Sequence, residues 1–153
     1  MDHEYGPDRK NRDVSRIPCA RLAGADGLCG IRRWFGIEFN GPFAPGAKLE
    51  GKVTTPGYEH LRAQVTVDRM EPEWLFSFRW HPAPVDPRRD YSREPTTVVA
   101  FQLSDVIGGT KLTLTESGFE QLPADRRNEA YRQNESGWTQ QIASLTRYLS
   151  PAA

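Results

Sequence analysis

The stretch PADRRNEAYRQNESGWTQQIASLTRYL, residues 123–149, decides the fold of this chain. Its apolar side chains recur at steps of three and four residues, which places them along one stripe of an α-helix. Pro123 and Ala124 begin the predicted helix, and Pro151 ends it. A long helix with one apolar face needs a sheet to pack against. The stripe consists of Ala130, Trp138, Ile142, Leu145 and Leu149.

The residues before this helix alternate as β-strands do. In residues 60–69 every second side chain is apolar, and in residues 74–80 three aromatic side chains share one face. The Glu-Pro-Glu sequence between the two segments predicts an antiparallel hairpin. The two inward faces consist of Leu61, Ala63, Val65 and Val67, and of Phe76, Phe78 and Trp80.

Three further segments complete the predicted sheet. Residues 48–55, 96–103 and 111–115 are predicted strands, and Gly108-Gly109 is predicted to form the turn between the last two. Residues 81–95 contain four prolines and several charges, so we expect a surface loop there. The order is therefore a meander of antiparallel strands followed by one long C-terminal helix, which is an α+β fold.

Bulk composition excludes several classes of function. The 153 residues suffice for one domain, and 20 basic against 20 acidic residues argue against a nucleic-acid or membrane-surface role. No apolar run is long enough for a membrane span, and the polar N-terminus is unlike a secretory signal. Cys19 and Cys29 have no neighbours at metal-ligand spacing. We therefore expect a cytoplasmic protein without a disulfide framework, a metal or a cofactor.

Several short motifs resemble one known family. They are Trp34-Phe35-Gly36, Pro45-Gly46, residues 76–80, residues 109–113, residues 116–119 and the helix motif of residues 134–138. Together they resemble the SRPBCC (START-like) superfamily, in its branch named after the activator of the heat-shock-protein-90 ATPase. The resemblance implies a helix-grip fold over residues 34–151, in which a curved antiparallel sheet wraps round the long helix and leaves a cavity between them.

The cavity that the resemblance implies has candidate lining residues. The aromatic candidates are Trp34, Phe39, Phe76, Phe78, Trp80, Phe119 and Trp138, and the polar candidates at its mouth are Arg79, Glu116 and Asn134. The simpler interpretation is that the aromatics fill a packed core, and that Arg79 and Glu116 are solvent-facing strand residues. Two glycines receive structural roles: Gly118 lets the chain leave a strand sharply, and Gly137 lets the helix backbone approach the sheet closely.

The sequence contains no catalytic constellation. His3, His60 and His81 lack partners at triad or ligand spacing, and phosphate-binding or dinucleotide-binding motifs are absent. The first functional hypothesis is therefore binding of a hydrophobic small molecule, by a monomer or homodimer. The alternatives are a co-chaperone-like protein-interaction module and a cyclase- or hydrolase-like enzyme, for which only Glu116, His60 and His81 could supply an acid–base pair.

Residues 1–33 depart from the family pattern. They lack the first strand and the short helix expected there, and their glycines weaken any helix. One permitted set of codons for residues 10–32, read one base later, encodes KTATFRGSRARVWRALTDSAEF, which contains a family-like VWRALTD. Our hypothesis is a frameshifted segment that is restored near Arg33. The alternative is a divergent but functional N-terminus.

The gene sequence tests the frameshift hypothesis directly. We expect the natural codons for residues 10–32 to encode VWRAL in the next frame, and a chain carrying that reading to unfold at a higher temperature than this one. Codons that encode no such segment would refute the hypothesis, as would equal melting temperatures of the two chains.

Overall fold

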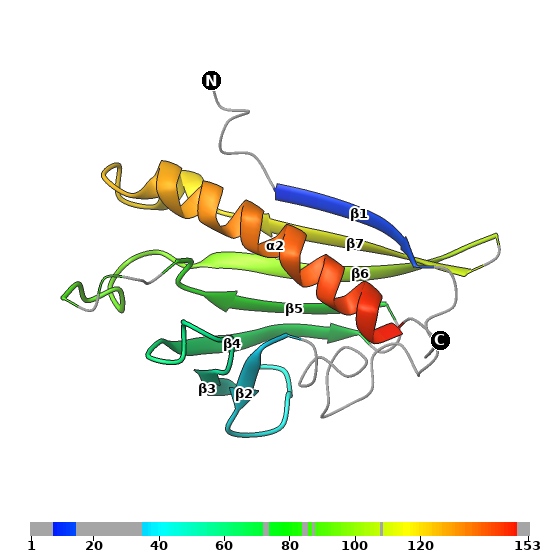
Figure 1. The fold of residues 1–153 in the computed structure, drawn as a ribbon, viewed down its shortest axis with the longest axis horizontal. Helices are drawn as coiled ribbons and strands as arrows, with labels where there is room; N and C mark the ends of the chain where they lie inside the picture. Colours follow the sequence, from blue (N-terminus) through cyan, green and yellow to red (C-terminus); the bar gives the residue numbers. More distant parts are fainter. Residues whose placement is uncertain are drawn as a thin grey trace.

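A seven-stranded antiparallel sheet crossed by one long helix forms this chain (Figure 1). The structure is a computed structural model that describes residues 8–14, 35–71, 74–83, 86, 88–107 and 109–149. The strand order is β1-β7-β6-β5-β4-β3-β2. The elements are β1 (Asp8–Val14), β2 (Ile37–Phe39), β3 (Lys48–Val53), β4 (Arg62–Glu71), β5 (Leu75–Trp80), β6 (Thr97–Val106), β7 (Gly109–Ser117), a 3-10 turn (Phe119–Gln121) and α2 (Arg127–Leu149).

The predicted hairpin is the centre of the sheet. Strands β4 and β5 pair antiparallel, with Val65 opposite Trp80 and Val67 opposite Phe78. A register shift between Val67 and Arg69 marks a β-bulge. Val65, Val67 and Phe78 are each at most 2% exposed, so the apolar face predicted from alternation is the core face. The hairpin prediction is confirmed.

Helix α2 lies across one face of the sheet (Figure 1). Its predicted apolar stripe is confirmed for Ala130, Trp138, Ile142 and Leu145, which are all buried. The predicted start at Pro123 is wrong by four residues, because the Pro123 carbonyl accepts the N–H groups of both Arg126 and Arg127 and closes a turn before the helix begins. Of the helices that the structure describes, none has the length and hydropathy needed to cross a bilayer.

The N-terminal part contains a strand that the sequence did not reveal. Strand β1 pairs with β7, from Asp8 opposite Glu116 to Val14 opposite Thr110, and so covers the edge of β7. The expected loss of the first strand is therefore wrong. The part of the chain in which the short helix was expected lies outside the described residues. The same is true of both cysteines, Trp34 and Pro151. In the β6–β7 turn, Val106 pairs with Gly109, so Gly109 belongs to β7, and Gly108 is outside the described part.

Two glycines with predicted roles have opposite outcomes. Gly118 follows β7 with φ +105°, a left-handed conformation that other residues rarely adopt, and this confirms the sharp exit from the strand. The role predicted for Gly137 is wrong. A Cβ atom built there would meet nothing within 4 Å, because that side of the helix faces an opening rather than the sheet.

Alanine substitutions should separate these two glycines. Gly137→Ala should raise the free energy of unfolding by about 1 kcal/mol, since alanine is the better helix former and has free space there. Gly118→Ala should lower it by at least a similar amount, because the positive φ strains any Cβ. Urea unfolding of the two variants measures both values, and a destabilised Gly137→Ala variant would contradict the open space beside Gly137.

Candidate functional site

Two adjoining cavities open between helix α2 and the sheet. The outer cavity has a volume of about 530 Å³ and is lined by residues 60–64 before and within β4, by the loop that follows β5, and by Trp80 and Asn134. The inner cavity has a volume of about 150 Å³ and lies beside Gly137 of the helix. Residues that line both cavities are Ile37, Val53, Trp80 and Asn134. Since the linings overlap, a single molecule could extend from one cavity into the other.

Three stacked aromatic rings form the wall of the inner cavity. The centroid of Phe35 lies 5.7 Å from that of Trp138 and 6.2 Å from that of Trp80, with interplanar angles of 10° and 18°. The rings of Trp80 and Trp138 are 5.6 Å apart and also stacked. Each ring comes from a different segment: Phe35 from the chain before β2, Trp80 from strand β5 and Trp138 from helix α2. This aromatic wall has a fixed geometry, and only a small part of Phe35 and of Trp138, each 2% exposed, borders the open volume.

A buried carboxylate lies behind the wall. Glu116 of β7 is 0% exposed. The indole N–H of Trp138 donates to its Oε1 at 2.7 Å, and the indole N–H of Trp80 donates to its Oε2 at 2.8 Å. The hydroxyl of Thr97 lies 2.5 Å from Oε2, and Nδ2 of Asn134 lies 2.9 and 3.1 Å from the two oxygens. Both oxygens of Glu116 are thus occupied.

The donors of this cluster match the acceptor oxygens of a carboxyl group. An indole N–H can only donate, and the amide nitrogen of Asn134 can only donate, so three of the four partners require an acceptor. Burial raises the pKa of Glu116, and the four hydrogen bonds oppose that rise only in part. The expectation that Glu116 faces solvent is therefore wrong. The alternation Leu112, Leu114, Glu116, with both leucines buried, was the sequence signal for its inward direction.

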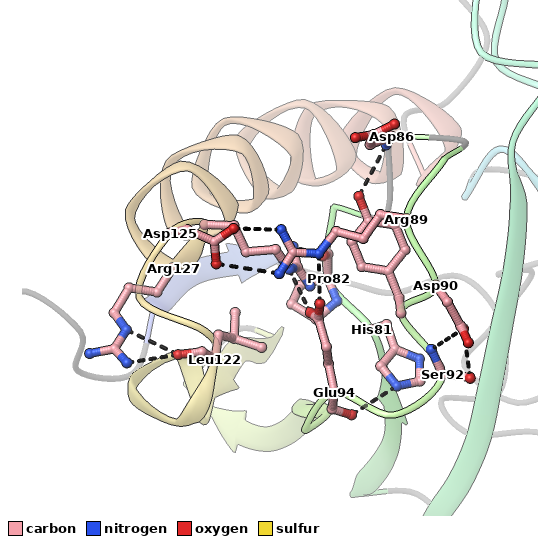
Figure 2. A network of polar contacts seen from close by, with 12 residues as sticks. His81, Pro82, Asp86, Arg89, Asp90, Ser92, Glu94, Leu122, Asp125 and Arg127 are labelled. Atoms are coloured by element: carbon pink, nitrogen blue, oxygen red, sulfur yellow. Dashed lines mark hydrogen bonds and ion pairs between the residues drawn. The ribbon is translucent and has the colours of Figure 1, made fainter.

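The loop between β5 and β6 forms the other wall of the outer cavity. It is fixed to the start of α2 by ion pairs, as Figure 2 shows: Arg89 bonds Glu94 at 2.8 Å and Asp125 at 2.7 Å. Arg126 bonds Glu94 at 2.6 Å and the Pro82 carbonyl at 2.9 Å. The predicted loop is confirmed for its described residues, but its ion pairs make it a fixed wall.

Arg126 is the buried member of this network. It is 8% exposed, and its guanidinium carbon lies 4.7 Å from the ring centroid of Tyr91. Its Nη2 atom has no hydrogen-bond partner among the described residues. Stacking on the Tyr91 ring supplies a cation–π interaction in its place. The Arg89 guanidinium also holds the pKa of Asp125 below its usual range.

Two histidines line the outer cavity. His81 is half-buried, and its Nε2 lies 3.1 Å from the Glu94 carbonyl oxygen, so this nitrogen carries the hydrogen. His60 is exposed at the cavity entrance. Among the described residues no group of three or more His, Cys, Asp and Glu side chains is placed to hold a metal ion. Each histidine is therefore a single polar group in the lining of the outer cavity.

The residues predicted to line the cavity divide into four groups. Trp80, Asn134 and Trp138 line the inner cavity, and Glu116 lies directly behind them. Trp34 lies outside the described residues. The remaining aromatics lie in the packed core and line neither cavity; these are Phe39, Phe76, Phe78 and Phe119. Arg79 is on the outer face, 3.8 Å from Asp68.

Sequence reasoning missed several lining residues. Phe35, Thr55 and Gln141 line the inner cavity, and Gln141 donates its Nε2 hydrogen to the Phe35 carbonyl at 2.7 Å. Phe35 stood in a quoted motif, and Gln141 lies one helical turn after Gly137, so spacing was an available signal for it. The loop residues gave no such signal, because their position depends on ion pairs with a distant helix.

Comparisons with known proteins agree with this fold. A sequence model of the family described as "Activator of Hsp90 ATPase homolog 1-like protein" matches residues 30–150. The solved structure of protein MLL2253 from Mesorhizobium loti has a TM-score of 0.66 at 23% identity and covers 92% of this chain and 94% of its own. No curated protein sequence matches.

Two further solved structures share the fold. The Aha1 dimer from Colwellia psychrerythraea has a TM-score of 0.63 at 17% identity, with 94% of this chain and 95% of that chain covered. DynU16, described as a putative protein in the dynemicin biosynthetic locus, has a TM-score of 0.64 at 21% identity, with 94% of this chain and 47% of that chain covered. Together these likenesses establish a helix-grip fold.

Substitution of the buried carboxylate should destabilise the protein. Glu116→Gln keeps the shape but turns an amide N–H toward donor groups, so we expect a loss of about 2 kcal/mol or more in the free energy of unfolding. Glu120→Gln, at an exposed position nearby, is the control and should change little. Chemical unfolding measures both.

The same variant tests the pKa of Glu116. Since burial raises this pKa, the folded protein binds the proton more tightly than the unfolded chain does. At pH values between the ordinary pKa of a glutamate and the raised pKa of Glu116, the contribution of this group to the free energy of unfolding should therefore fall as pH rises. The difference in unfolding free energy between the parent chain and Glu116→Gln should shrink with rising pH over that window. A difference that grows with pH there would contradict the raised pKa.

Proposed function

Because this chain belongs to the family of activator of Hsp90 ATPase homolog 1-like proteins, whose fold supports ligand-binding or interaction modules, we propose that it binds a small apolar molecule in the outer and inner cavities. The observation that carries this proposal is the aromatic wall of Phe35, Trp80 and Trp138 beside open volume. Sites for small molecules are concave and mostly apolar, with a few placed polar groups. The outer cavity's volume of about 530 Å³ lies within their usual range of about 300–1,000 Å³.

Binding is favoured over catalysis because two of the candidate acid–base groups, Glu116 and His81, already form hydrogen bonds within the protein. Both oxygens of Glu116 are occupied by donors from the protein, so this carboxyl has no free atom to exchange a proton with a molecule in the cavity. His81 uses its Nε2 to bind the Glu94 carbonyl. A cyclase- or hydrolase-like reaction would need an acid–base pair directed into the cavity.

A protein-interaction module is the second candidate. One structure with this fold is described as a dimer, and Trp74 and Ile107 are exposed in the β4–β5 and β6–β7 turns, which lie at the same end of the sheet. Single exposed apolar side chains are common on monomeric proteins, whereas a contiguous patch marks an interface. Light scattering of the purified chain distinguishes a monomer from a homodimer, and Trp74→Ser with Ile107→Ser should weaken any dimer that uses this end.

A leucine at Gly137 should block ligand binding without weakening the fold. The side chain of Gly137→Leu would extend into the inner cavity, and leucine is a better helix former than glycine. We expect the affinity for the neutral fluorescent probe N-phenyl-1-naphthylamine to fall about tenfold or more, while the melting temperature stays equal or rises.

The matched control is Ser136→Leu, one residue earlier in the helix. Ser136 is exposed and lines neither cavity, so the same leucine there should leave probe affinity unchanged. Equal affinities for the parent chain and Gly137→Leu would place the probe elsewhere and overturn the proposal, as would no probe binding at all.

A further inference from the structure

The polar groups around the inner cavity are few, and their directions are set by the protein. The polar side chains that line it, apart from the two indoles, are Thr55, Asn134 and Gln141. A side-chain amide has a donating end and an accepting end. Which end faces a ligand decides what chemistry the ligand needs. The following argument rests on the proposed function and concerns which class of molecule that site takes.

The amide of Asn134 is oriented by Glu116. Its Nδ2 atom lies 2.9 Å from Oε1 and 3.1 Å from Oε2 of the carboxyl group. Both carboxyl oxygens accept from Nδ2 and also from the indole N–H groups of Trp80 and Trp138, so the nitrogen end of the amide is held on that side. Asn134 also lines both cavities. Its Oδ1, the accepting end, is therefore the end left for a ligand.

The indole and amide donors of the wall are already used, whereas the Thr55 hydroxyl can both donate and accept. The N–H groups of Trp80 and Trp138 both bind Glu116, so these residues offer a ligand only the carbon atoms of their rings. Gln141 donates through Nε2 to the Phe35 carbonyl, which turns the donating end of this second amide toward the backbone. Apart from the Thr55 hydroxyl, the wall thus presents aromatic carbon atoms and amide oxygens.

We propose that the ligand carries a hydrogen-bond donor, a hydroxyl or N–H group on an apolar ring system, that meets Oδ1 of Asn134, and that the site rejects a carboxylate at this position. A ligand without a donor would displace water from Oδ1 of Asn134 and leave this oxygen without a hydrogen bond, which lowers the affinity. An anionic group would bring a further acceptor against the amide oxygen and lie near the buried Glu116. The site therefore selects alcohols, phenols or amines over acids and ethers of similar shape.

Three ligands of one size test this selection on the unmodified chain. They are 2-naphthol, which has a donor, 2-methoxynaphthalene, which has none, and 2-naphthoate, which is an anion at neutral pH. We expect 2-naphthol to bind roughly tenfold more tightly than the ether, because the ether leaves one hydrogen bond to a buried acceptor unmade. The carboxylate should bind most weakly. Titration calorimetry measures the three affinities.

The outcomes separate this inference from the proposed function. If the ether or the carboxylate binds as tightly as 2-naphthol, and Gly137→Leu still weakens all three, the cavity is the site but the donor requirement is wrong. If none of the three ligands binds, the proposed function fails and this inference fails with it.

A variant locates the effect at one atom. Asn134→Leu should reduce the preference for 2-naphthol over the ether to near unity, while Gln133→Leu, on the exposed side of the same helix turn, should keep it. An unchanged preference in folded Asn134→Leu would overturn the role of the amide. If Asn134→Leu does not fold, the ligand series on the parent chain still decides the proposal.

Discussion

The hydrogen-bonded carboxyl group of Glu116 connects the sheet to the helix, and the position of the helix depends on this connection. It lies on β7 and receives donors from β5, from the first residue of β6 and from two residues of α2. A buried polar group is costly unless it is satisfied, and here the satisfaction requires the helix to lie at one position along the sheet. Because Asn134 and Trp138 are themselves one turn apart, sliding the helix by one turn would replace one of these two donors with the apolar side chain of Ala130 or Ile142. The apolar stripe attaches the helix to the sheet, and the carboxyl group sets the register.

The cavities follow from the same constraint. Trp80 and Trp138 turn their N–H groups toward Glu116, and their rings then pack in a compact group with Phe35 rather than filling the space beside Gly137. The missing side chain at Gly137 leaves that space open. At the other cavity, ion pairs of Arg89 and Glu94 with Asp125 and Arg126 fix the loop to the turn before α2. A satisfied polar cluster, one glycine and a fixed loop together keep an apolar volume from collapsing.

Much of the fold could be predicted from the sequence because its elements have clear periods. The alternation of residues 60–69 and 74–80 and the helical stripe of residues 130–145 each carry their own evidence. The candidate site could be predicted only where it lies on these elements, as for Trp80, Asn134 and Trp138. The inward direction of Glu116 was also implicit in its alternation with Leu112 and Leu114, but its charge argued for solvent. What could not be predicted depends on contacts between distant segments: the loop anchored at Arg126 and the open side of Gly137.

The stacked indoles of Trp80 and Trp138 have an optical consequence. Two such chromophores, 5.6 Å apart in a fixed and chiral arrangement, couple their electronic transitions. The far-ultraviolet circular dichroism of the folded chain, where indole absorbs most strongly, should therefore contain a paired positive and negative band that neither tryptophan would give alone. Since both rings are held by one carboxyl group, the amplitude of that signal reports on the seating of the helix against the sheet.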